Sequence, residues 1–127
     1  MSQVQQLPLN LRTWFVIHFV ADMLFAIPLM LAPEYTLQLL GWTTIDPIAT
    51  RLVAAALFGI GIESLLGRKA SPETFKAMLN LKVIWSGTAS LGIVWSVLNG
   101  GPESAWMVAG IFAVFCVVWT RYRILMR

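Results

Sequence analysis

Two ionisable residues interrupt the first long apolar stretch of the chain. Residues 14–31 read WFVIHFVADMLFAIPLML, and this stretch contains His18 and Asp22. Because the two residues are four positions apart, their side chains lie on the same face of a helix. A carboxylate near the centre of a bilayer costs about 2.5–3.5 kcal/mol on insertion scales. We therefore expect Asp22 to face protein or water and to have a partner on another helix.

Two more ionisable residues, Glu63 and Lys82, occur at similar depths in later apolar stretches. At about 1.5 Å of rise per residue, Glu63 and His18 lie about 5 and 8 Å from the same end of their helices. Lys82 and Asp22 lie about 9 and 14 Å from that end. Buried ions are tolerated when they are paired and hydrogen-bonded. We therefore predict a polar cluster in which Asp22 pairs with Lys82, and His18 pairs with Glu63 or Asp22.

This polar cluster has a functional and a structural interpretation, and the sequence leaves both open. The functional one is a site that handles protons or cations, or a polar pocket for a small ligand, because ionisable residues within a membrane suggest a functional site by default. The structural one is a set of salt bridges that fixes the order of the helices. The candidate ligand- or ion-binding residues are His18, Asp22, Glu63, Lys82, Trp85 and Ser86.

Sequence motifs of known catalytic and metal sites do not occur in the chain. It has no nucleophile elbow, phosphate loop or dinucleotide fingerprint. Cys116 is its single cysteine, and no His-x-x-x-His or Glu-x-x-His spacing is present. We therefore predict no catalytic residue set, no metal site and no cofactor. The His18–Asp22 pair could still act as an acid–base unit on a lipid or quinone, which is the least favoured function.

The composition is that of an integral membrane protein. Of the 127 residues, 58% are hydrophobic and 12% are charged, whereas about 45–50% and about 25% are usual in soluble domains. We expect a single domain covering residues 1–127. The net charge is +3, but the basic residues flank apolar stretches, which is typical of membrane orientation rather than of a nucleic-acid partner.

Four apolar stretches are long enough to cross a bilayer, which requires about 20 helical residues. They predict helices at about 11–32, 47–66, 72–98 and 102–122. Asp46–Pro47 and Ser71–Pro72 each supply a capping residue and a first-turn proline. Residues 34–40 are too few to span and predict a short interfacial helix. The predicted fold is an all-α integral membrane four-helix bundle with this short helix between the first two spans.

The second predicted span is unusually rich in small residues, which allow helices to approach closely in lipid. These residues are Ala54, Ala55, Ala56, Gly59 and Gly61. We therefore expect this helix to be the most enclosed of the four. We also expect Gly59 to lie at a contact between helices.

The basic residues are distributed unevenly between the two ends of the predicted bundle. Seven of the nine Lys and Arg residues lie on the side of the termini: Arg12, Arg68, Lys69, Lys76, Arg121, Arg123 and Arg127. The opposite side has Arg51 together with three acidic residues. The positive-inside rule therefore predicts that both termini are cytoplasmic. We expect the membrane to be a bacterial inner membrane.

The sequence favours a non-enzymatic membrane subunit or a partner-binding scaffold. We expect its partners to be the lipid bilayer and either copies of itself or another membrane protein. The alternative is a small oligomeric proton-coupled transporter or channel that uses Asp22. In size and number of spans the chain is similar to the small multidrug-resistance transporters, which place an essential glutamate in their first helix, where this chain has Asp22.

Overall fold

The computed structural model describes residues 6–127, and within this range the regular elements are helices. They are α1 (Leu11–Leu31), α2 (Pro33–Leu39), α3 (Pro47–Leu66), the short 3-10 helix η1 (Gly67–Lys69), α4 (Pro72–Leu98) and α5 (Ala105–Leu125). The segments Leu11–Leu31, Pro47–Lys69, Pro72–Leu98 and Ala105–Leu125 are long and apolar enough to cross a membrane. The all-α prediction, with a short helix between the first two spans, is confirmed.

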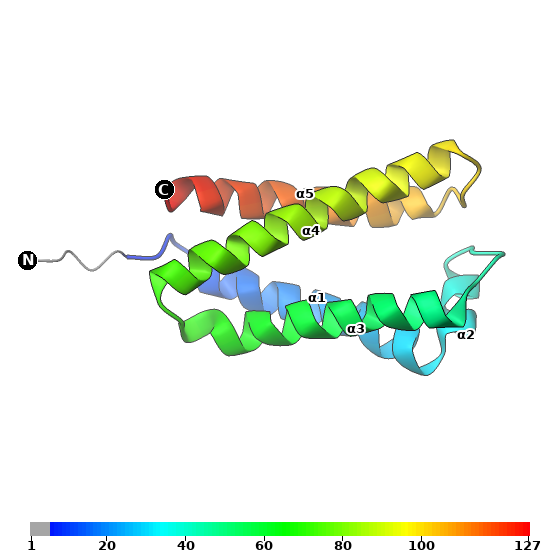
Figure 1. The fold of residues 1–127 in the computed structure, drawn as a ribbon, viewed down its shortest axis with the longest axis horizontal. Helices are drawn as coiled ribbons and strands as arrows, with labels where there is room; N and C mark the ends of the chain where they lie inside the picture. The colour runs from blue at the N-terminus through cyan, green and yellow to red at the C-terminus, as the bar shows by residue number, and fades with distance from the viewer. Residues whose placement is uncertain (1–5) are drawn as a thin grey trace, which may run out of the picture.

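The four long helices form two hairpins (Figure 1). Helix α1 packs along α3, and α4 packs along α5. The start of α1, the η1 turn and the end of α5 lie together at one end of the molecule, which we call the terminal end. There the Arg12 side chain donates to the carbonyl of Arg68 at 2.9 Å, and the Tyr122 hydroxyl donates to the carbonyl of Leu9 at 3.0 Å. The opposite, distal end contains α2 and the α4–α5 connection.

Two apolar clusters hold these hairpins. The first joins α1 to α4 and α5 at the terminal end and contains Leu11, Phe15, Phe75, Met78, Leu79, Trp119, Tyr122 and Met126. The second consists of Ala26, Leu29, Ala54 and Leu57, all from the α1–α3 hairpin. At the distal end the hairpins meet through a loop contact, in which the Ser104 hydroxyl donates to the carbonyl of Leu40. The main contact between the hairpins is therefore at the terminal end.

The predicted helix starts at Asp46 and Ser71 are confirmed in atomic detail. Asp46 Oδ1 accepts from the backbone N–H groups of Ile48 and Ala49 at 2.9 and 3.3 Å. Ser71 Oγ accepts from the backbone N–H of Thr74 at 3.3 Å. These bonds satisfy N–H groups that have no partner within the helix.

The fourth span differs from its predicted bounds, because α5 begins at Ala105 and ends at Leu125 rather than running from 102 to 122. Residues 102–104 form tight turns instead, with the N–H of Ala105 donating to the carbonyl of Pro102 at 3.0 Å. Past the predicted end, Met126 is buried in the first apolar cluster. Packing at both ends therefore shifts the helix by three residues toward the C-terminus relative to its predicted bounds.

The packed face of α3 is not the one expected around Gly59. The buried residues of α3 are Thr50, Ala54, Leu57, Gly61 and Ser64, which recur every three or four positions and so share one face. A Cβ built on Gly61 would lie 2.8 Å from Cβ of Asp22, whereas one built on Gly59 would meet nothing within 4 Å. The prediction for Gly59 is therefore wrong, and Gly61 is the glycine at the close contact between α1 and α3.

Candidate functional site

Lys82 is the centre of a buried polar network where the hairpins meet. Its side chain is 2% exposed, and Nζ donates to Nδ1 of His18 at 2.6 Å and to the hydroxyl of Ser64. The same Nζ lies 4.6 Å from the ring centroid of Phe15 and 4.8 Å from that of Trp119. These rings attract the ammonium through their negative faces. The ammonium is thus held by two hydrogen bonds and two aromatic rings.

His18 connects Lys82 to Asp22. An ammonium can only donate, so Nδ1 of His18 accepts and the ring proton resides on Nε2. Nε2 lies 3.3 Å from Oδ1 of Asp22. The imidazole packs against Phe115 and Trp119, with centroid distances of 4.9 and 5.1 Å. These contacts fix the ring, so that the three side chains form a chain from ammonium through imidazole to carboxylate.

Three transmembrane helices supply the polar atoms of this network. His18 and Asp22 come from α1, Ser64 from α3 and Lys82 from α4. Ser64 lies on the buried face of α3, where its hydroxyl donates to the carbonyl of Ile60 at 2.8 Å. Its oxygen can therefore accept from Lys82. The network links the two hairpins in the terminal half of the molecule.

The predicted direct ion pair between Asp22 and Lys82 is wrong. Within residues 6–127 the ion pair is that of Lys76 with Glu73, and Asp22 contacts the neutral ring of His18 instead of Lys82. His18 lies one helical turn closer than Asp22 to the terminal end, at nearly the estimated depth of Lys82. The imidazole therefore fills the position next to the ammonium and bridges the two charges. The predicted contact between His18 and Asp22 is confirmed.

The other candidate residues lie around the network rather than in it. Glu63 is exposed on α3 and does not contact His18. Ser86 is buried, and its hydroxyl donates to the carbonyl of Lys82 at 2.6 Å. Trp85 packs on Phe112 with a centroid distance of 5.9 Å, and its indole Nε1 is buried without a hydrogen-bond partner in the described part of the chain.

Sequence reasoning missed Ser64, Phe15 and Trp119 as partners of the ammonium. Ser64 had one usable signal, because it continues the series Ala54, Leu57 and Gly61 along α3. That series could have placed the hydroxyl on the face that packs against α1. The two aromatic residues had no comparable signal, since apolar residues occur on every face of these helices.

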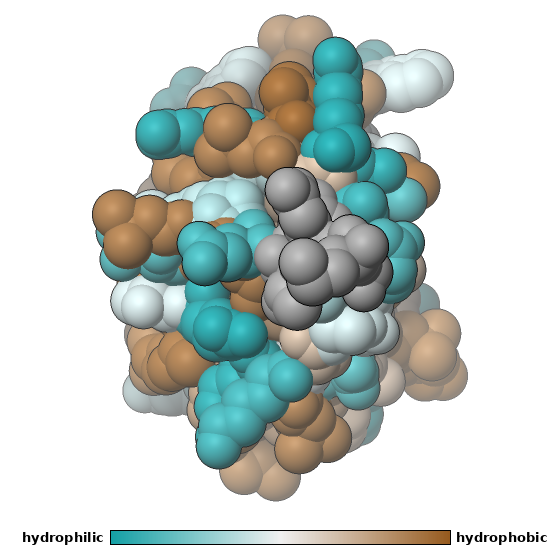
Figure 2. Space-filling view, turned by 90° about the vertical axis from the view of Figure 1, so that its left-hand side faces the viewer, coloured by the Kyte–Doolittle hydropathy of each residue, from teal (hydrophilic) through white to brown (hydrophobic). Residues whose placement is uncertain are grey.

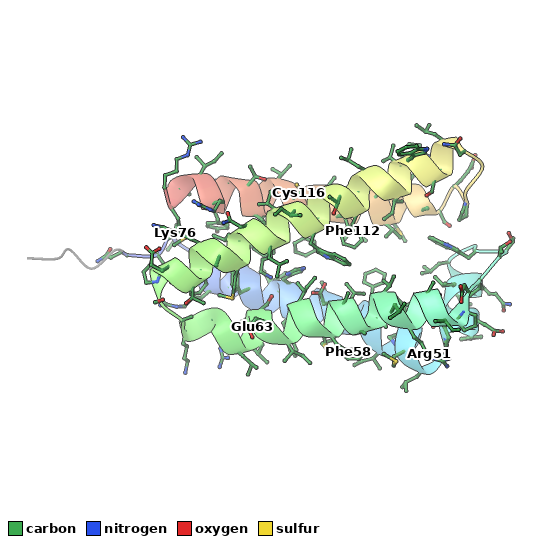
Figure 3. All side chains as sticks on the ribbon, in the orientation of Figure 1. Arg51, Phe58, Glu63, Lys76, Phe112 and Cys116 are labelled. Atoms are coloured by element: carbon green, nitrogen blue, oxygen red, sulfur yellow. The ribbon has the colours of Figure 1, made fainter. Side chains whose placement is uncertain are left out.

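A cavity of about 100 Å³ adjoins the network between the two hairpins. His18 and Asp22 line its polar end, and apolar side chains that include Phe25, Leu57 and Phe112 line the remainder. Phe112 points from α5 toward the α1–α3 hairpin (Figure 3). Asp22 Oδ2 is buried, and no group within residues 6–127 gives it a hydrogen bond. The cavity is thus apolar except for the end formed by a carboxylate and an imidazole.

A second cavity, of about 210 Å³, lies between α3 and α4. Glu63, Ser64 and Lys82 contribute its polar groups, and Gly59 and Met78 also line it. Figure 3 shows Glu63 on the α3 side of this region. The Lys82–His18–Asp22 chain therefore has one cavity at its ammonium and another at its carboxylate.

Neither a metal-binding arrangement nor a known relative indicates the function of this site. Among the residues that the structure describes, no group of three or more His, Cys, Asp or Glu side chains could hold a metal ion. The chain matches no family model, no curated protein and no solved structure. Its function is therefore argued from the geometry of the network and the two cavities.

Proposed function

We propose that the protein is a non-enzymatic membrane scaffold that binds a partner molecule between its two hairpins. The observation that carries the proposal is the cavity beside Asp22, which lies between the cluster at the terminal end and the loop contact at the distal end. The Lys82–His18–Asp22 chain fastens the hairpins on one side of that cavity. A binding site supported by such a rigid, buried network keeps its shape.

The distribution of charge supports an orientation with cytoplasmic termini. Figure 2 looks onto the terminal end, where many hydrophilic side chains lie among hydrophobic ones. The basic residues at this end follow the positive-inside rule. We extend the proposal to a single four-span domain in a bacterial inner membrane, able to associate with copies of itself. The bilayer itself contacts the many exposed apolar side chains.

A cavity-filling substitution tests the scaffold proposal. Val53 lines the cavity and is 46% exposed, so Val53→Phe can fill the cavity without replacing a buried residue. Val114→Phe is the matched control, because Val114 is 61% exposed on α5 and does not line this cavity. Native mass spectrometry of the proteins in lipid nanodiscs should find a bound, non-lipid mass on the parent protein and on Val114→Phe, but not on Val53→Phe. The same bound masses on all three proteins would refute the proposal.

Transport is the second candidate, because the polar chain has a cavity at each end. A proton entering near Glu63 could pass through Lys82 and His18 to reach Asp22. The variant Asp22→Asn distinguishes this function from scaffolding. If the variant inserts and assembles normally but loses a pH-dependent flux in proteoliposomes, transport is supported. If it fails to assemble, the structural function is supported.

A further inference from the structure

Three basic side chains gather around the η1 turn at the terminal end. Arg12 Nε donates to the carbonyl of Arg68 at 2.9 Å, and Nη1 of Arg68 donates to the carbonyl of Leu65. The first contact brings the start of α1 to η1, where Lys69 follows Arg68 in the chain. Arg12 and Lys69 are exposed and Arg68 is half-buried, so a ligand can reach all three from outside the protein. We call Arg12, Arg68 and Lys69 the η1 basic cluster.

The acidic residues of the chain leave this cluster without a counter-charge. Asp22 belongs to the buried network, and Glu73 pairs with Lys76 at 3.2 Å. Glu63 Oε1 lies 3.2 Å from the position of a Cβ on Gly67, beside η1, but Glu63 forms no ion pair within residues 6–127. Residues 1–5 contain no acidic residue. The three remaining acidic residues belong to the distal end: Glu34, Asp46 and Glu103.

Neutral oxygen atoms hold the two arginines, so their charges and most of their donors remain available. A guanidinium has five N–H donors in a planar fork that matches the oxygens of a phosphate. Arg12 and Arg68 each give one nitrogen to a backbone carbonyl, and no other acceptor within residues 6–127 bonds to either side chain. Positive charges held close together repel one another unless an anion joins them. The cluster is therefore complementary to a phosphate group.

The position of Arg12 on α1 indicates that this phosphate belongs to a lipid. Residues four positions apart lie along one face of a helix. Val16 and Val20, which follow Arg12 at that spacing, are 37% and 48% exposed. Arg12 thus stands at the terminal end of an apolar stripe on a membrane-spanning helix, where its side chain can extend toward the headgroups. A phospholipid has the matching shape, with its phosphate at the cluster and an acyl chain along the stripe.

The charge of the cluster distinguishes between phospholipid headgroups. Phosphatidylethanolamine carries an ammonium group beside its phosphate, and the three positive charges of the cluster would repel it. Phosphatidylglycerol offers the same phosphate without a cation. Each Lys or Arg near a membrane surface strengthens the attraction to anionic lipid by about fivefold. The cluster should therefore prefer phosphatidylglycerol.

We infer that the η1 basic cluster is a binding site for an anionic phospholipid. Arg12 and Arg68 donate to the lipid phosphate, and Lys69 adds a third positive charge. The acyl chain lies along Val16 and Val20 of α1. This site lies outside the two cavities beside the polar network. The inference therefore does not depend on the proposed scaffold function.

Native mass spectrometry of the intact protein, titrated with lipid, tests this inference. Phosphatidylglycerol and phosphatidylethanolamine with identical acyl chains are compared, and the dissociation constant of the first bound lipid is measured for each. The parent protein should prefer phosphatidylglycerol. That preference should fall about fivefold in Arg12→Gln and further when Arg68→Gln is added.

Two single variants are matched controls. Arg51 Nε donates to the carbonyl of Met30 at 3.0 Å, so Arg51→Gln removes a similar hydrogen bond at the distal end. Arg121 is exposed on α5 and lines a different surface groove, so Arg121→Gln removes a charge at the terminal end but outside the cluster. Both variants should keep the preference of the parent protein.

Several outcomes would overturn the inference. Equal affinities of the parent protein for the two lipids would show that no anionic lipid is selected. An equal loss in Arg121→Gln and Arg12→Gln would assign the preference to diffuse charge rather than to this cluster. Displacement of phosphatidylglycerol by water-soluble glycerol phosphate would mean that the ligand is a free phosphate. Should Arg12→Gln not fold, Lys69→Gln is used instead, and an unchanged preference in it would refute the site.

Discussion

Adding one methyl group at Gly61 tests how closely α3 approaches α1 beside the polar network. The new Cβ would lie 2.8 Å from Cβ of Asp22 and 3.0 Å from Cε of Met23. The methionine methyl group can move aside because its side chain is flexible. The Asp22 Cβ cannot, since it is attached directly to the backbone of α1. We therefore expect Gly61→Ala to push the two helices apart.

The size of the effect follows from comparison with Gly59, two residues earlier on the same helix. Exchanging glycine for alanine within a helix favours folding by about 1 kcal/mol. At Gly59 nothing opposes this gain, because a Cβ there meets nothing within 4 Å. At Gly61 overpacking costs about 1–3 kcal/mol. Because the helix propensity term is the same at both positions, Gly61→Ala should be less stable than Gly59→Ala by about 1–3 kcal/mol.

Reversible unfolding in mixed detergent micelles, followed by circular dichroism, gives the free energies of unfolding of both variants. Equal stability of Gly61→Ala and Gly59→Ala would refute the close approach of α3 to α1. Greater damage from Gly59→Ala would mean that α3 packs through its opposite face.

Two further predictions concern the charges of the molecule. Asp22→Asn and Lys82→Met should each destabilise the protein and show a coupling energy of about 0.5–3 kcal/mol in a double-mutant cycle measured by unfolding. Most of that coupling should vanish when the same cycle is measured in a protein in which His18 is replaced by phenylalanine. A coupling that survives this replacement would indicate direct attraction between Asp22 and Lys82. In a cysteine-free background, new cysteines at Ala70 and after Arg123 should react with a membrane-impermeant maleimide in inverted vesicles. Their reaction in intact cells would contradict cytoplasmic termini.

Much of the fold follows from local sequence signals. The apolar stretches give the four spans, and the prolines at positions 47 and 72 give the starts of α3 and α4. These features depend on residues close together in the chain. The start of α5 was missed by three residues because Ser104 takes part in a contact with Leu40, sixty-four positions away. Such a contact has no local signal.

The packed faces of the helices were harder to predict than their bounds. In a soluble protein the apolar stripe of a helix marks its buried face, but a transmembrane helix is apolar on all sides. Small residues occur on both faces of α3, so composition could not distinguish the exposed Gly59 from the enclosed Gly61. The buried series from Ala54 to Ser64 becomes evident only with α1 beside it.

The polar network was predicted in part. Counting residues along each helix predicted similar depths for His18, Asp22 and Lys82, because each helical residue adds a fixed rise. Depth does not give the rotation of one helix about its axis relative to another. For that reason the sequence paired Lys82 with Asp22, whereas the structure places His18 between them. The cavity depends on how the hairpins pack against each other and had no sequence signal.

The link from Lys82 through His18 to Asp22 is the central claim, and the single histidine of the chain makes it measurable. Nitrogen-15 NMR of the labelled histidine in lipid nanodiscs should show an unprotonated Nδ1 and a protonated Nε2. Through-space transfer should connect Nδ1 to a lysine Nζ, as the distance of 2.6 Å requires, and this transfer should be absent in Lys82→Met. A proton on Nδ1, or no transfer to any lysine nitrogen in the parent protein, would contradict the link.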